Sequence, residues 1–196
     1  MARTKTLKEL QDLTLKFINS YSSDGEILPV SDNADLLLVI DNYLNIAYYE
    51  FVQIDKILVS EDYTILDETL RPDGVTKQYV LPNDYLDFYK VEYNTFDQEI
   101  TDFSIMGNLL LAKTTSDPIT LWYYQLPDEL SLPTDVPLIR AQYHTALPLY
   151  AAGKWLHQNG KQSDAIDLFT LYNDAKEAVI PTRHKGINKI RTVYGV

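Results

Sequence analysis

Apolar residues recur at three- and four-residue spacing through the first sixty positions, which predicts two helices. In the first, residues 6–21, the apolar positions are Leu7, Leu10, Leu13, Phe17 and Tyr21. The second, residues 33–58, has a wider stripe, because a second apolar row accompanies the first at Leu37, Leu44 and Tyr48. We expect this second helix to be central and to pack on more than one side.

From residue 63 to residue 126 the pattern changes to short runs of β-branched and aromatic residues, separated by Gly and Pro turns. The expected strands are Tyr63–Leu66, Lys77–Val80, Phe88–Tyr93, Asp102–Met106, Leu109–Lys113 and Ile119–Tyr124. The dipeptide Gly107-Asn108 predicts a tight hairpin turn. Because every connection is too short for a parallel crossover, we expect neighbouring strands to be antiparallel.

Two more helices are predicted after this β region, over residues 138–158 and 163–180. Pro148 falls inside the first of them and is expected to kink it, because proline lacks an amide donor. The predicted fold class is therefore α+β: a helical body of two N-terminal and two C-terminal helices, with an inserted antiparallel β region. We expect residues 1–180 to form a single domain and residues 181–196 to form an extended C-terminal arm.

The charge is distributed unevenly along the chain. The net charge is −11, yet residues 1–16 carry four basic and two acidic residues, and residues 181–196 carry four basic residues and no acid. Residues 17–180 therefore hold 9 basic and 26 acidic residues, a net charge of −17. A chain with an acidic body and basic ends is suited to docking through its ends onto acidic partners. The body itself is poorly suited to nucleic-acid binding, which needs clustered Lys and Arg.

The arm, residues 181–196, carries the strongest local signal for function. Apolar and basic residues alternate in it with strand-like spacing, so the arm can add itself to the edge of a partner's sheet. A disordered terminus is the alternative interpretation. The candidate partner-binding residues are Arg183, Lys185, Ile187, Lys189, Ile190, Arg191, Val193 and Tyr194.

Signatures of catalysis are missing from the sequence. The seven glycines form no phosphate-binding loop, and the chain has no cysteine for a disulfide or a thiolate metal site. Three histidines occur, at His144, His157 and His184, without the spacing of metal ligands. We expect His144 to lie on a helix surface or at the edge of the core. The sequence predicts no enzyme, no cofactor and no metal ion.

Aromatic residues are abundant and include fifteen tyrosines. They cluster at Tyr85–Tyr93 and at Trp122–Tyr124, where they alternate with other strand residues. Platforms that stack single-stranded nucleic acid interleave aromatic with basic residues, whereas acidic residues such as Asp84 and Asp87 are the neighbours here. The aromatics are therefore expected at the edge of a core or at a protein interface.

No signal peptide is recognisable at the N-terminus, and the longest aliphatic run, Leu36–Ile40, is too short to span a membrane. We expect a soluble intracellular or virion protein without a membrane partner.

Four segments, taken in order, resemble the head-to-tail adaptor (connector) proteins of tailed bacteriophages. Besides the N-terminal helical pair, they are Tyr79–Val91 with its Leu-Pro-Asn-Asp-Tyr motif, Ile119–Pro127 with its Tyr-Tyr-Gln-Leu-Pro motif, and the Tyr-His-containing segment Pro137–Ala152 followed by Asp164–Ala175. The resemblance implies a dodecameric ring in the neck of the virion, between capsid and tail, assembled in the host cytoplasm. It also implies that helices line the DNA channel, that the C-terminal arm contacts the portal protein, and that the β region faces the stopper or tail protein. Genomic DNA would then pass through without specific binding.

Other functions remain open from the residues themselves. The chain can be a tail-completion or other neck component of a phage particle, or a non-viral soluble interaction domain. An enzyme or regulatory module with an unrecognised site, and a nucleic-acid binder acting through the basic tail, are further alternatives.

Overall fold

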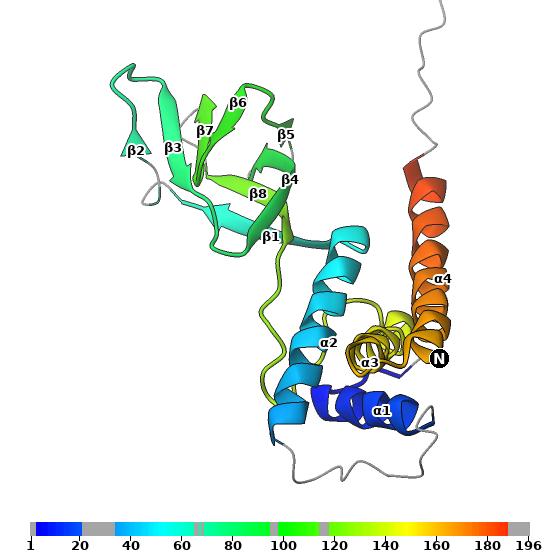
Figure 1. Cartoon of the computed structure of the whole chain (residues 1–196). Coiled ribbons are helices and arrows are strands. Elements are labelled where there is room, and N and C mark those ends of the chain that lie inside the picture. Colours follow the sequence, from blue (N-terminus) through cyan, green and yellow to red (C-terminus); the bar gives the residue numbers. More distant parts are fainter. Residues whose placement is uncertain are drawn as a thin grey trace, which may run out of the picture. The chain divides into compact units, whose positions relative to one another are not determined.

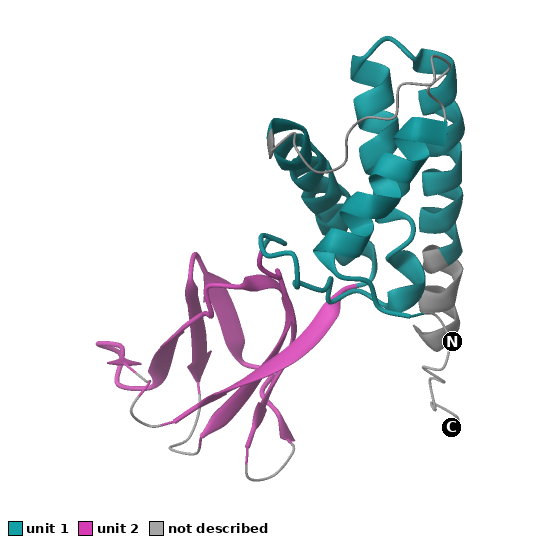
Figure 2. Cartoon of the chain, turned by 90° about the horizontal axis from the view of Figure 1, so that it is seen from below, with its two compact units in different colours: residues 1–55, 129–196 teal, residues 56–128 magenta. Residues whose placement is uncertain are grey.

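The computed structural model describes residues 3–20, 34–64, 67, 69–94, 98–113 and 118–187. These residues form four α-helices and two antiparallel sheets, so the predicted α+β class is confirmed. The chain divides into two compact units, drawn in separate colours in Figure 2. Unit 1 comprises residues 1–55 and 129–196 and contains the helices, and unit 2 comprises residues 56–128 and contains the strands.

Unit 1 is built around its third helix (Figure 1). The helices are α1 Leu7–Ser20, α2 Ala34–Ile54, α3 Leu147–Gln158 and α4 Gln162–Ile187. Helix α3 packs against all three others. At Gly153 a Cβ atom would lie 2.8 Å from a ring carbon of Phe169, so the absence of a side chain allows the close approach of α3 and α4. The helix expected to be central, α2, also contacts the other three, but it shares that position with α3.

The C-terminal end of α2 differs from the prediction. A helix was expected as far as residue 58, yet α2 ends at Ile54 and strand β1 occupies Ile57–Tyr63. Leu58 and Val59 pair with Tyr124 and Tyr123 of a distant strand. The apolar spacing of residues 54–58 is compatible with both structures, and pairing across the sheet decides for the strand.

The long helix predicted over residues 138–158 is also wrong in its first half. Ala141–Tyr143 form a short 3₁₀ helix, and α3 begins only at Leu147. Pro148 therefore lies in the first turn of α3, where its missing amide donor costs no hydrogen bond, and it does not kink a longer helix.

Helix α4 continues beyond its predicted end at residue 180. It runs through Pro181 to Ile187, so an extended arm is wrong for residues 181–187. A proline inside a helix removes one amide donor, at a cost of about 3 kcal/mol, but leaves the rest of the hydrogen-bond ladder available. The remaining part of the predicted arm, residues 188–196, lies outside the described residues.

Unit 2 consists of two four-stranded antiparallel sheets. The first has the strand order β1-β8-β4-β5, in which β8 is Ile119–Gln125, β4 is Tyr85–Tyr93 and β5 is Gln98–Glu99. The second has the order β2-β3-β7-β6, formed by Thr69–Leu70, Thr76–Val80, Leu109–Lys113 and Phe103–Met106. All strand pairs are antiparallel, as predicted.

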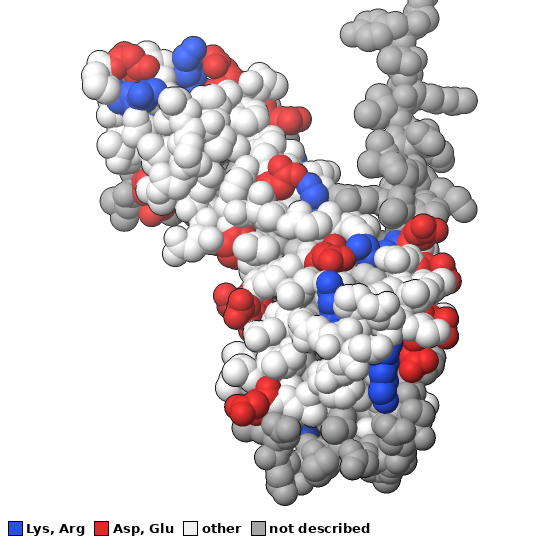
Figure 3. All heavy atoms as spheres, viewed as in Figure 1, with Lys and Arg blue, Asp and Glu red and all other residues white. Residues whose placement is uncertain are grey.

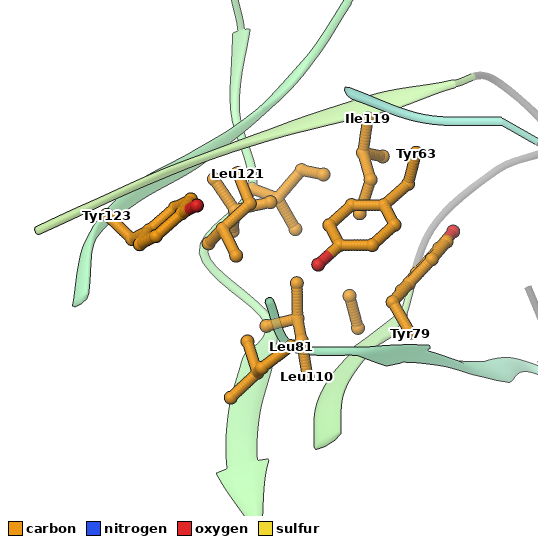
Figure 4. Close-up of a cluster of buried hydrophobic side chains, with 10 residues drawn as sticks. Tyr63, Tyr79, Leu81, Leu110, Ile119, Leu121 and Tyr123 are labelled. Atoms are coloured by element: carbon orange, nitrogen blue, oxygen red, sulfur yellow. The ribbon is translucent and has the colours of Figure 1, made fainter. Parts of the chain in front are cut away.

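A hydrophobic core fills the space between the two sheets (Figure 4). Tyr63, Leu121 and Tyr123 from the first sheet face Tyr79 and Leu110 from the second, and all five side chains are buried. The hydroxyl of Tyr63 donates a hydrogen bond of 2.7 Å to the backbone carbonyl of Val80, which satisfies the polar end of a buried ring. Tyrosines thus supply much of the core volume of unit 2.

Five of the six predicted strands are recovered, Leu109–Lys113 with the predicted bounds and the other four with shifted bounds, and the Gly107 hairpin is confirmed. Met106 pairs with Leu109, and Gly107 has φ of 61°, a conformation that favours glycine. The short strands β2 and β5 had not been predicted. The first strand had been expected at residues 63–66, whereas β1 ends at Tyr63.

Candidate interaction surfaces

Only some of the residues predicted to bind a partner are described, because the described part of the chain ends at Ile187. The backbone of Arg183, Lys185 and Ile187 belongs to the last turns of α4. The other candidates lie outside the described residues: Lys189, Ile190, Arg191, Val193 and Tyr194. The described structure does not bring the eight residues together into one site.

An exposed apolar surface lies elsewhere, on the segment between the strands and α3. We define the linker surface as Leu132, Pro133, Val136 and Leu138. The side chain of Leu132 is 60% exposed and that of Leu138 is 58% exposed. Neither leucine is next to a charged residue in the sequence. Exposed aliphatic side chains this close together are typical of surfaces that a partner covers.

Side chains of α2 hold the backbone under the linker surface. The amide nitrogen of Asn45 donates to the carbonyl of Leu130 over 3.0 Å, and its oxygen accepts from the Leu130 amide over 2.8 Å. The Tyr48 hydroxyl accepts a 3.0 Å hydrogen bond from the amide of Leu138. Because both anchors come from a buried helix face, the linker is held in one conformation without secondary structure of its own.

The turn within the linker is closed by Asp135. Its carboxylate accepts hydrogen bonds from the amides of Ser131 and Leu132, at 2.8 and 2.7 Å. Hydrogen bonds from the Leu132 and Ser131 amides hold the pKa of Asp135 below its ordinary value. The Asp135 carbonyl in turn accepts from the amide of Leu7, so the turn also caps the first turn of α1. A surface fixed in advance loses less conformational entropy when a partner binds.

His144 is a structural residue of unit 1. Its side chain is 0% exposed, and Nδ1 accepts a 3.0 Å hydrogen bond from the amide of Lys5. Nε2 lies 3.0 Å from the carbonyl of Ile139, so it carries the proton and donates. The neutral ring thus joins the N-terminal segment to the linker. The expected position on a helix surface or core edge is wrong, because the His144 side chain is fully buried and both of its ring nitrogens bond to backbone groups.

Unit 2 carries a second exposed surface, on the side of the first sheet opposite its core. We define the aromatic face as Leu58, Tyr89, Trp122 and Tyr124. Trp122 and Tyr124 alternate along β8 with the buried Leu121 and Tyr123, and therefore point away from the core. The Tyr89 and Tyr124 rings meet edge to face with centroids 5.8 Å apart. Tyr89 is 49% exposed, and this surface agrees with the expectation that the aromatics lie at a core edge or an interface.

Charged side chains fix the orientation of the aromatic face. The Nε1 hydrogen of Trp122 is donated to Oε1 of Glu92 over 2.6 Å, while Lys90 pairs with the same carboxylate. The Lys90 Nζ lies 5.1 Å from the indole centroid, within cation–π range. The hydrogen bond with Lys90 contributes most to holding the pKa of Glu92 below its ordinary value. Lys56 makes the equivalent contact over Tyr124 and pairs with Asp87.

A shallow cavity of about 240 Å³ lies on unit 2, lined by Arg71, Thr76, Asp102, Phe103, Ser104, Leu111 and Lys113. Within this lining, Lys113 forms an ion pair with Asp102 at 3.2 Å. The Thr76 hydroxyl already donates a hydrogen bond to Asp73. The polar groups of this cavity are therefore largely satisfied within the chain, and we assign it no ligand.

Sequence reasoning recognised the aromatic face through its aromatic residues and missed the linker surface. The sequence predicted no surface on residues 127–137, which lie between the predicted β region and the helix predicted from residue 138. A recognisable signal was present, since Leu132, Val136 and Leu138 alternate with two prolines and a turn-forming aspartate.

No protein-family model matches the chain, and no curated protein matches it significantly. In the described part of the chain, no group of three or more His, Cys, Asp or Glu side chains is placed to hold a metal ion. No helix within those residues is long and apolar enough to cross a membrane.

Proposed function

We propose that the protein is a structural subunit of a tailed-phage particle, an adaptor whose copies form a dodecameric ring between the portal and the tail or stopper. The ring continues the DNA channel, and genomic DNA passes through it without specific binding. The protein acts by binding other proteins and carries no catalytic site.

One observation carries the proposal: each unit has its own preorganised apolar surface. The linker surface on unit 1 is exposed, and the aromatic face on unit 2 is exposed at Leu58 and Tyr89 and half-buried at Trp122 and Tyr124. Polar side chains fix both surfaces. A subunit of a closed ring needs complementary patches for two neighbours, and an adaptor needs further surface for partners above and below the ring. The order of elements along the chain and the resemblance to adaptor proteins support the same role.

Charge supports the role of the channel and of the C-terminal residues. The excess of acidic residues in 17–180 repels DNA, so the genome can slide past without adhering. The acid-free residues 181–196 supply the basic end that contacts the portal. Its first seven residues belong to α4, and residues 188–196 lie outside the described residues.

Electron-microscopy class averages of the protein mixed with its candidate portal ring test this function. We expect an added collar with the rotational order of the portal. A folded protein and an intact portal without a collar would overturn the adaptor role and favour a tail-completion or other neck component.

Two variants refine the test. The double variant L132D/L138D places charges on the linker surface and is expected to prevent collar formation while the protein stays folded. L38D is the matched control, because Leu38 is 62% exposed on α2 and lies outside both surfaces. An equal loss of the collar in both variants would show that the linker surface has no special part in assembly.

A further inference from the structure

The outward side of α4 carries aliphatic side chains between acidic ones. We define the α4 face as Ile166, Asp167, Leu171, Asp174 and Glu177, which helical periodicity places within an arc of about 140°. Ile166 is 62% exposed and Leu171 50%. Figure 3 shows acidic atoms along the side of unit 1 where α4 runs. Among residues whose side chains the structure describes, no cation pairs with Asp167, Asp174 or Glu177.

Helix α4 is anchored to unit 1 through the side opposite the α4 face, so the α4 face is not needed for the fold of unit 1. Ala165, Leu168 and Tyr172 pack inward and are at most 2% exposed. The Tyr172 hydroxyl and Lys176 both bind Glu50 of α2, which closes that side of the helix. Two aliphatic residues and three acids with no cationic partner among the described side chains thus face solvent on a helix that is already anchored.

One segment of this chain has the complementary chemistry. Residues 188–196 contain Lys189 and Arg191, no acid, and four apolar residues, Ile190, Val193, Tyr194 and Val196. Extended backbone advances about 3.3 Å per residue, so six of the nine residues span the roughly 17 Å between positions 166 and 177 of a helix. Length, charge and apolar content therefore match the α4 face.

Residues 188–196 cannot cover the whole α4 face of their own chain. Ile166 precedes the last described helical residue, Ile187, by 21 positions, or about 32 Å of helix. Nine residues reach about 30 Å when fully extended, before any residue is spent on reversing direction. A segment folding back on its own helix ends short of Ile166, whereas a segment from another copy has no such limit.

We propose that residues 188–196 of one copy bind the α4 face of a second copy. Lys189 and Arg191 approach the acidic side chains, and the apolar residues cover Ile166 and Leu171. One such contact is small, but repetition around a closed assembly raises its effective strength. The α4 face is thus a second binding partner for residues 188–196, which the proposed function assigns to the portal. Because the contact involves only copies of this chain, it can be tested without a portal.

Cysteine crosslinking provides the first test, since the chain has no cysteine of its own. Full-length I166C and a larger, tagged V193C are mixed and mildly oxidised. We expect a disulfide-linked heterodimer in excess of either homodimer. L38C replaces I166C in the control, because Leu38 and Ile166 are both 62% exposed. Absence of the I166C–V193C product, or equal crosslinking of L38C, would overturn the proposal.

Exchange of charges provides the second test. D167K/D174K reverses the α4 face, and K189E/R191E reverses the segment. Each variant alone is expected to self-associate roughly tenfold more weakly in sedimentation velocity, because attraction becomes repulsion. An equimolar mixture should associate more strongly than either variant alone, because both pairings between the two variants are complementary while each variant still repels its own copies.

The mixture also separates the two possible sources of the segment. If the contact formed within one chain, mixing the variants would restore nothing, and the proposal of a second copy would be wrong. If neither variant changed self-association, the α4 face would have a different occupant. Failure of the portal collar together with a successful charge exchange would overturn only the proposed function.

Discussion

The two units use different means to fix the chain. In unit 1 a long irregular segment is placed by side chains distant in sequence: Asn45 binds Leu130, and His144 binds Lys5 and Ile139. In unit 2 the ladders of two sheets place the backbone, and tyrosines fill the core between them. The irregular segment of unit 1 therefore depends on a few polar side chains, whereas the strands of unit 2 are held by hydrogen bonds spread along the backbone.

The largest expected effect comes from a charge in either core. F51D should unfold unit 1, because Phe51 is fully buried between Tyr143 and Tyr172, and loss of a buried Phe alone costs about 3–5 kcal/mol. We expect unit 2 to stay folded, since its core cluster contains only its own residues. In a W155F background, fluorescence of Trp122 reports on unit 2 and circular dichroism at the helix band reports on unit 1.

L121D is the reciprocal variant, because Leu121 is fully buried in unit 2. It should abolish the native Trp122 signal and spare the helices. If each substitution removed both signals, the two units would be a single cooperative domain.

The next largest effect is expected at His144. H144A leaves the Ile139 carbonyl and the Lys5 amide without their partner, at a cost of about 1–3 kcal/mol for each group that stays buried. Thermal and urea unfolding measure the loss. H157A is the control, since His157 is exposed at the end of α3 and should change stability little. Equal stability of the two variants would contradict the bridging role of His144.

Alkaline pH should weaken both units through their tyrosines. Burial, the main cause, and nearby carboxylates raise the pKa of Tyr63 in unit 2 and of Tyr172 in unit 1. The unfolded state loses these protons near pH 10 and the folded state keeps them, so stability is complete below about pH 10 and falls above it. Urea unfolding between pH 8 and about pH 11 should show a shallower fall in Y63F and Y172F. The control is Y89F, at an exposed tyrosine, and its stability should decline with pH in the same way as that of the wild type.

The smallest effect is expected at a turn of unit 2. Hydrogen bonds, first from the Thr76 hydroxyl and then from the Thr76 and Val75 amides, lower the pKa of Asp73 to about 2. This contribution is present above the unfolded pKa of about 3.9 and is lost as the pH falls towards 2. D73N should therefore show a shallower acid decline of stability. D102N, at an exposed carboxylate, should keep the wild-type decline, and identical curves for all three proteins would refute the turn's contribution.

The sequence by itself determined the local elements of this protein. Periodic apolar residues defined α1, most of α2 and the packed part of α4, and glycine marked the β6–β7 hairpin at Gly107. These features depend on residues a few positions apart, so a local pattern records them. The aromatic clusters of β4 and β8 were visible in the sequence for the same reason, but their division between the aromatic face and the core, where Tyr123 lies, was not predicted.

Only the tertiary structure decided the remaining features. Residues 57–63 became a strand because β8 pairs with them. Residues 138–146 formed only a short 3₁₀ helix at Ala141–Tyr143, and His144 bonded to the backbone of Lys5 and Ile139. The linker surface depends in the same way on Asn45 and Tyr48 of a helix more than eighty residues away. Hydrogen bonds between such distant residues leave no periodic trace in the chain, because each needs only one polar side chain at the right place in space.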